Sequence, residues 1–125
     1  MPSYDSLLFT PPAPVARVAL RDPTTGARVE NVPLLIDSGA DATLLPRSSI
    51  DSLGIAIEPN ATYELVAFDG TSSTSISIRA DLIWQGKTFK GEFLLTEQEV
   101  GYLGRDVLNH LSMLLDGRNL SWELK

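Results

Sequence analysis

The chain has 125 residues, of which 43% are hydrophobic and 21% are charged, which is typical of one globular domain with a hydrophobic core. It has no cysteine and one histidine, His110, so disulfides, thiol catalysis and a multi-histidine metal site within one chain are excluded. The net charge of −6, without clustered Lys or Arg, argues against nucleic acid as a partner.

The first fourteen residues predict an extended tail. Pro11, Pro12 and Pro14 favour a polyproline-like path with few backbone donors. We therefore expect a Pro-rich tail over residues 1–14 and the folded domain over residues 15–125. The apolar run 7–9 is too short for a signal peptide, and no run is long enough to span a bilayer. These features predict a cytoplasmic protein that does not associate with a membrane.

From Val15 onward the pattern is that of β-strands. Residues 15–20 alternate loosely, the cluster 22–26 predicts a turn, and a second strand follows over 28–36. The successive apolar residues 33–36 predict burial on both faces of this strand. Residues 47–53 fit a short helical turn that Gly54 ends.

Two hairpins and a helix follow. The first hairpin is expected over 63–79 with its tip at 68–73, and the second over 81–95 with its tip at 85–87. The helical spacing of apolar residues predicts a helix over 105–115, and 120–124 alternates as a last strand. The aromatic side chains Trp84, Phe89, Phe93 and Trp122 are expected in the core or an interface. Together, the predicted strands, hairpins and helices indicate a mainly β domain.

The most informative segment is Leu34 to Asp41, where a buried strand leads directly into Asp37-Ser38-Gly39. A glycine here lets other groups approach the carboxylate closely, and the serine can bond to neighbouring backbone. Asp-Ser-Gly is also a common solvent turn. A second apolar piece, 44–46, follows at once, and a solvent turn is rarely bracketed so tightly by core segments.

These residues resemble the retropepsin-like (retroviral-type) aspartic proteases. The family signature, apolar-apolar-Asp-Thr/Ser-Gly-Ala, reads here as Leu35 to Ala40, and a second signature, apolar-apolar-Gly-Arg opening the C-terminal helix, reads as Tyr102 to Leu108. The resemblance covers roughly residues 15–124. It implies a closed, barrel-like fold with one short C-terminal helix and a flap hairpin. The flap tip here is more polar than the glycine-rich retroviral tip.

The resemblance also implies roles for single residues. Asp37 is the catalytic acid, Ser38 reaches across to the partner chain, and Arg105 braces the active-site turn by pairing with Asp41. An ordinary solvated turn and a helix-surface charge are the alternatives for Asp41 and Arg105. The full set of expected residues is Asp37, Ser38 and Gly39 for catalysis, Ala40, Asp41, Phe68, Asp69, Gly70 and Thr71 for substrate binding, and Gly104 and Arg105 for support of the site.

A single Asp-Ser-Gly implies a homodimer. Peptide hydrolysis by this route needs two carboxylates around one water, one acting as general base and the other donating a proton. Because the chain offers one such motif, a two-fold axis between two copies of Asp37 completes the site. The sequence thus predicts an aspartic endopeptidase (a hydrolase) that cuts extended peptides, needs no cofactor or metal, and loses activity at high pH.

Two other readings stay open at this point. One is a peptide-binding or dimerisation module that keeps the fold without efficient cleavage, because fold alone does not fix function. The other, compatible with the protease, is a processing domain cut from a larger precursor. A serine triad built on His110 lacks its nucleophile elbow, because the sequence has no Gly-x-Ser-x-Gly.

Overall fold

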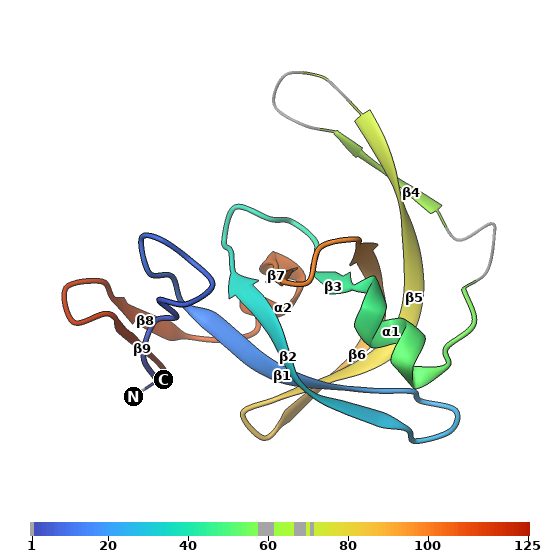
Figure 1. The fold of residues 1–125 in the computed structure, drawn as a ribbon, viewed down its shortest axis with the longest axis horizontal. Coiled ribbons are helices and arrows are strands. Elements are labelled where there is room, and N and C mark those ends of the chain that lie inside the picture. The colour runs from blue at the N-terminus through green and yellow to red at the C-terminus, as the bar shows by residue number, and fades with distance from the viewer. Residues whose placement is uncertain (1, 58–61, 67–69, 71) are drawn as a thin grey trace.

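The structure is a computed structural model that describes residues 2–57, 62–66, 70 and 72–125 (Figure 1). The chain alternates short strands with two brief helices. In chain order the elements are β1 (Val15–Arg21), β2 (Arg28–Ile36), β3 (Leu44–Pro46), α1 (Arg47–Leu53), β4 (Thr62–Val66), β5 (Ser72–Trp84), β6 (Lys87–Thr96), β7 (Gly101–Leu103), α2 (Arg105–Leu108), β8 (Met113–Asp116) and β9 (Ser121–Leu124).

The main sheet closes on itself. Its strands follow the order β1-β2-β7-β3-β6-β5-β4, and β1 also pairs with β5, so a barrel of six strands forms with β4 outside it. Antiparallel pairs dominate, but β2 and β7 are parallel, as are β3 and β6. Closure removes the free edges of the barrel strands. The expected closed, mainly β architecture is confirmed.

The core lies inside this barrel and under α1. β1 buries nearly every side chain except Arg17, which faces outward. On α1 the buried residues Ile50 and Leu53 are three apart and face the barrel, and Gly54 ends the helix with a left-handed φ of 74°. The largest fully buried side chains are Val18, Leu20, Leu34, Thr43, Leu45, Pro46, Ile50, Leu82, Leu103 and Val107.

Both expected hairpins are present. β4 pairs with the first part of β5, from Thr62 opposite Ile76 to Val66 opposite Ser72. The second part of β5 pairs with β6 around a tight turn at Gln85 and Gly86, whose φ values of 52° and 74° suit a two-residue hairpin turn. One long strand, β5, therefore belongs to both hairpins.

The expected helix 105–115 is wrong in length, because α2 ends at Leu108. Residues Met113–Asp116 instead form β8, which pairs antiparallel with β9. Leu114 and Leu115 are 42% and 51% exposed, so the helical spacing that included them did not mark a buried face. Strand pairing with β9, whose Trp122 packs against Trp84 with ring centroids 5.4 Å apart, replaces the helix.

The expected extended path of the N-terminal tail is wrong: residues 6–8 and 10–11 bend, and the tail folds back on itself and lies against the rest of the protein. Ser3 forms an antiparallel bridge with Ser121, and Asp5 forms one with Ala13. The segment between them is thus a loop at the end of the molecule that also holds β8, β9 and the C-terminus (Figure 1). Within the described residues, no helix is long and apolar enough to cross a membrane.

Candidate active site

Asp37 lies where β2 leaves the barrel. The last register pair of the parallel strands β2 and β7 is Ile36 with Leu103. The N–H of Asp37, the next residue, donates to the carbonyl of Leu103 at 3.0 Å. Because β7 lies between β2 and β3 in the sheet, the turn after β2 must cross the end of β7 to reach β3 (Figure 1). The strand ends therefore fix the position from which the carboxylate of Asp37 projects.

The carboxylate itself is oriented by its own turn. The N–H of Gly39 donates to Oδ1 of Asp37 at 2.9 Å, and the N–H of Ala40 donates to the Asp37 carbonyl at 3.2 Å. A Cβ on residue 39 would lie 3.1 Å from the same Oδ1, which is a crowded distance. Among the described residues no other donor contacts the Asp37 carboxylate, which is partly exposed.

The junction between β7 and α2 holds this turn from beneath. The N–H of Arg105 donates to the carbonyl of Ala40 at 2.8 Å. At Gly104 a Cβ would lie 2.7 Å from the carbonyl carbon and oxygen of Ala42 and 2.9 Å from the carbonyl oxygen of Ala40. Residue 104 must therefore lack a side chain for the two segments to pack this closely.

Arg105 braces the turn, but through a different partner than expected. Its guanidinium donates to the carbonyl of Ser38 at 2.7 Å, and no ion pair with Asp41 is found among the described residues. Asp41 is exposed and forms no hydrogen bond within the described part of the chain. The Arg105 side chain therefore holds the turn through its backbone, while Asp41 faces solvent.

A second brace, which the sequence did not reveal, joins Thr43 to α2. The hydroxyl of Thr43, which is fully buried, donates to Oδ1 of Asp106 at 2.6 Å and accepts the N–H of Gly104 at 3.0 Å. The N–H of Thr43 donates to the other carboxylate oxygen of Asp106 at 3.1 Å. In the sequence, the one sign of this contact is that a polar residue, Thr43, directly precedes the apolar run 44–46.

The candidate flap is the hairpin of β4 and β5. Its two strands rise beyond the barrel at the upper side of the view, the side toward which the turn after β2 also points (Figure 1). Gly70 has a left-handed φ of 85° and is exposed. The expected flap residues Phe68, Asp69 and Thr71 lie outside the described residues.

One solved structure with a similar fold is the EIAV protease complexed with the inhibitor HBY-793. It is 21% identical to this chain with a TM-score of 0.61, and the match covers 85% of this chain and 91% of that one. The chain has a retropepsin-like fold. The sequence matches no protein-family model, and no curated protein is similar enough to match it.

The remaining polar residues do not form a metal centre in the part of the chain described. No group of three or more His, Asp or Glu side chains there is arranged to hold a metal ion. His110 is exposed beyond the end of α2. The candidate site thus consists of Asp37 and the residues that hold its turn.

Proposed function

We propose that this chain is an aspartic endopeptidase that acts as a homodimer, with Asp37 of each copy supplying one of two catalytic carboxylates. The observation that supports this most is the placement of Asp37, in a turn held by Gly104 and Arg105 at the parallel pair of β2 and β7. The same fold in the EIAV protease, a protein bound to an inhibitor, adds support.

In this mechanism one water lies between the two Asp37 carboxylates. The ionised carboxylate removes a proton from the water as its oxygen attacks the peptide carbonyl, and the protonated carboxyl group donates its proton to the carbonyl oxygen. As the C–N bond breaks, the proton taken from water passes to the leaving nitrogen, and a hydroxyl proton of the tetrahedral intermediate returns to the other carboxylate, so that the pair again holds one proton. Two carboxylates this close share one proton, because the repulsion between two negative charges prevents both from ionising together. The shared proton therefore belongs to the pair and not to either residue alone.

The residues around Asp37 have proposed roles in this dimer. Ser38, which is exposed, would contact the partner's turn across the two-fold axis, and exposed Asp41 would accept hydrogen bonds from backbone N–H groups of the substrate. Ala40 would line the same groove. The flap residues Phe68, Asp69, Gly70 and Thr71 would close over an extended peptide and exclude water.

The experiment is cleavage of a mixed peptide library, read by mass spectrometry across a range of pH, for the native chain and Asp37→Asn. We expect cuts by the native chain alone, with activity lost at alkaline pH once the shared proton is gone. Cleavage that persists in Asp37→Asn would refute the role of Asp37. Peptide binding without turnover by a folded dimer would instead support the binding-module function.

A further inference from the structure

A cavity of about 400 Å³ lies between β6 and α2. It is lined by residues 88–93 of β6, by part of α2 and by the turn that follows this helix. Sites for small molecules have volumes of roughly 300–1,000 Å³, so this cavity is large enough for a ligand. The helix α2 also holds the candidate active-site turn through Arg105 and Asp106, so an occupant of the cavity would contact an element that supports Asp37.

The cavity exists because residue 91 is a glycine. A Cβ on Gly91 would meet no atom of the described residues within 4 Å. Alternate residues of a strand face the same side, so Gly91 faces the side on which Phe89 and Phe93 pack against the core. The residue opposite Gly91 on β5 is Ala80, which is fully buried. Two small residues therefore lie next to each other in a layer of large apolar side chains.

The usual structural reasons for a glycine within a strand do not apply to Gly91. The register of β5 and β6 runs without a shift from Ser77 opposite Leu94 to Trp84 opposite Lys87, so the strand has no bulge here. Gly91 is not among the glycines with a positive φ, and no other described segment approaches it closely. The close approach of a ligand is the remaining reason that accounts for a glycine at this position.

The gap over Gly91 has the dimensions of an aromatic ring. With a rise of about 3.3 Å per residue, the Cα atoms of Phe89 and Phe93 lie about 13 Å apart along β6. Contacting aromatic rings have centroids about 4.5–7 Å apart, so one ring over Gly91 can contact both phenylalanines. An apolar cavity of about 150 Å³ already admits benzene, so this cavity has room for a ring and a substituent.

The charges around the cavity balance one another. The charged lining side chains and their ion-pair partners comprise equal numbers of bases and acids: Arg21, Arg79, Lys90, Asp81, Glu92 and Asp106. Glu92 pairs with Arg79 and Lys90 pairs with Asp81, each at 3.7 Å. A net charge on the ligand would therefore gain little, and an anion would also be repelled by the chain's charge of −6. The cavity suits a neutral molecule.

His110 offers such a molecule a hydrogen-bonding group. Its side chain is exposed at the cavity and forms no hydrogen bond or ion pair within the described part of the chain. The Asp106 carboxylate, in contrast, already accepts hydrogen bonds from Thr43 and Val107. A neutral imidazole has one donor and one acceptor nitrogen, so it can bind a hydroxyl or an N–H group on the ring of a ligand.

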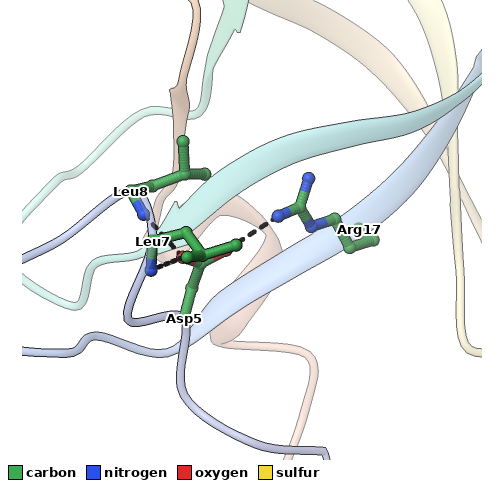
Figure 2. A network of polar contacts seen from close by, with 4 residues as sticks. All are labelled: Asp5, Leu7, Leu8 and Arg17. Atoms are coloured by element: carbon green, nitrogen blue, oxygen red, sulfur yellow. Dashed lines mark hydrogen bonds and ion pairs between the residues drawn. The ribbon is translucent and has the colours of Figure 1, made fainter.

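Asp5 shows the opposite arrangement at two other cavities. It borders both of them, but Figure 2 shows its carboxylate accepting the N–H groups of Leu7 and Leu8 at 2.9 and 2.7 Å and pairing with Arg17 at 2.7 Å. These contacts use the carboxylate to hold the N-terminal loop. Asp5 is therefore occupied by the protein itself, whereas His110 is not.

We propose that the cavity between β6 and α2 binds a neutral aromatic ring with one hydrogen-bonding substituent, as in a phenol or an indole. The ring lies over Gly91 between Phe89 and Phe93, and its substituent bonds to His110. This inference goes beyond the proposed function and does not rest on it, because one chain forms the whole cavity. Such rings occur as free small molecules and as tyrosine and tryptophan side chains, and the experiments distinguish these two sources.

The first test compares a flat ring with a saturated one. The native chain is titrated with p-cresol and with 4-methylcyclohexanol, which keeps the hydroxyl and methyl groups but is not aromatic. His110 is the single histidine, so the NMR signals of its ring protons report on this cavity alone. We expect p-cresol to shift these signals saturably and the saturated alcohol to bind about tenfold more weakly. No saturable shift, or equal binding of both, overturns the inference.

The second test fills the gap. Valine is favoured in strands, so Gly91→Val should fold while its side chain enters the space of the ring, and the Kd for p-cresol should rise by at least about tenfold. Lys87→Val is the matched control, because it places the same side chain on β6 at an exposed residue outside the cavity. Thermal unfolding verifies that both variants are folded. Unchanged binding in folded Gly91→Val contradicts the position of the ring.

The third test removes the hydrogen bond and leaves the gap unfilled. In His110→Ala the affinity for p-cresol should fall about two- to tenfold, whereas toluene, which lacks the hydroxyl, should bind as it does to the native chain. Isothermal titration calorimetry measures both ligands. Equal losses for the two ligands, or no loss for p-cresol, would refute a hydrogen bond to His110.

N-acetyltyrosinamide identifies the source of the ring, because it carries the same phenol on a peptide-like backbone. If it shifts the His110 signals with an affinity similar to that of p-cresol, the site accepts a tyrosine side chain of another protein. If p-cresol binds and the amide does not, the occupant is a free small molecule. If neither ligand binds, the cavity is not a site for aromatic rings.

Discussion

Gly39 has two structural roles in the candidate active-site turn. Its N–H orients Oδ1 of Asp37, and its lack of a side chain keeps that oxygen uncrowded. We expect Gly39→Ala to lower kcat/KM by as much as about 100-fold, because small displacements of a catalytic group are costly, while the melting temperature changes little. Steady-state kinetics on a peptide found in the library screen measures this. Full activity in Gly39→Ala would show that the turn tolerates the extra carbon.

The Thr43 hydroxyl is a second point where one side chain holds the site. Thr43→Val leaves the buried N–H of Gly104 without a partner and removes one of the two hydrogen bonds to Oδ1 of Asp106, which keeps the N–H of Val107, so we expect a loss of about 1–3 kcal/mol in the free energy of unfolding. Urea denaturation measures the change. Thr43→Ser keeps the hydroxyl and is the matched control; a loss as large as that of Thr43→Val would indicate that the methyl group, not the hydrogen bonds, matters.

The sequence identified only part of this site. Asp37, Gly39, Gly104 and Arg105 follow from two short motifs, and the structure brings all four together. The partner of Arg105 was not predictable from the sequence, because a guanidinium can donate to a carboxylate or to a carbonyl. Which of the two lies within its reach depends on the path of the turn. The Thr43–Asp106 contact joins residues 63 apart in the chain, which no local pattern encodes.

At the scale of elements, the close approach of the β7–α2 junction to the turn is the main constraint. Gly104→Ala places a methyl group against the backbone of Ala42, and the backbone cannot move aside as a side chain can. We expect a destabilisation of about 1–3 kcal/mol with loss of activity, measured by thermal unfolding and peptide cleavage.

Gly117→Ala is the matched control for that change. Residue 117 lies in the β8–β9 turn, where a Cβ would meet no atom within 4 Å. It should therefore leave both stability and activity near the native values. Equal effects of the two substitutions would mean that the packing at residue 104 is not special.

The elements themselves were largely readable from the sequence. Loose alternation over 15–20, the apolar run 33–36 and the hairpin tip at 85–87 predicted strands and a turn that the structure contains. Burial on one face of a sheet leaves a period-two apolar signal, and burial on both faces leaves a continuous one. The prediction of a helix over 105–115 was wrong in length for a physical reason. A run containing Leu108, Leu111 and Leu115 satisfies helical spacing, but pairing with β9 is a long-range contact that local spacing does not report.

At the scale of the whole molecule, acid should release the N-terminal loop. The N–H groups of Leu8 and Leu7, together with Arg17, hold the pKa of Asp5 below its ordinary value of 3.8, against an opposing effect of desolvation. A depressed folded pKa contributes stability that is present above 3.8 and is lost as the pH falls through the folded value. Docking of the loop should thus be complete at neutral pH and weaken in acid.

Hydrogen exchange of the Leu7 and Leu8 amides measures this docking. Their protection, corrected for intrinsic exchange rates, should fall in acid for the native chain and should be low at every pH in Asp5→Ala, which has no side-chain acceptor. Protection that is independent of pH in the native chain would show that Asp5 does not hold the loop.

The whole-molecule arrangement also explains what the tail does, which composition could not reveal. Three prolines predict an extended path but not its neighbour, and the neighbour is β9, more than a hundred residues later in the chain. This contact places both termini at the end of the protein that holds the N-terminal loop and the β8–β9 hairpin (Figure 1).

The measurement that tests the central claim most directly is a mixing experiment with native chain and Asp37→Asn under conditions where dimers exchange subunits. If each site needs Asp37 from both copies, mixed dimers are inactive, and an equal mixture should show about half the activity per native chain. If each chain carries a complete site, activity per native chain will not change on mixing, and the shared two-carboxylate site is refuted.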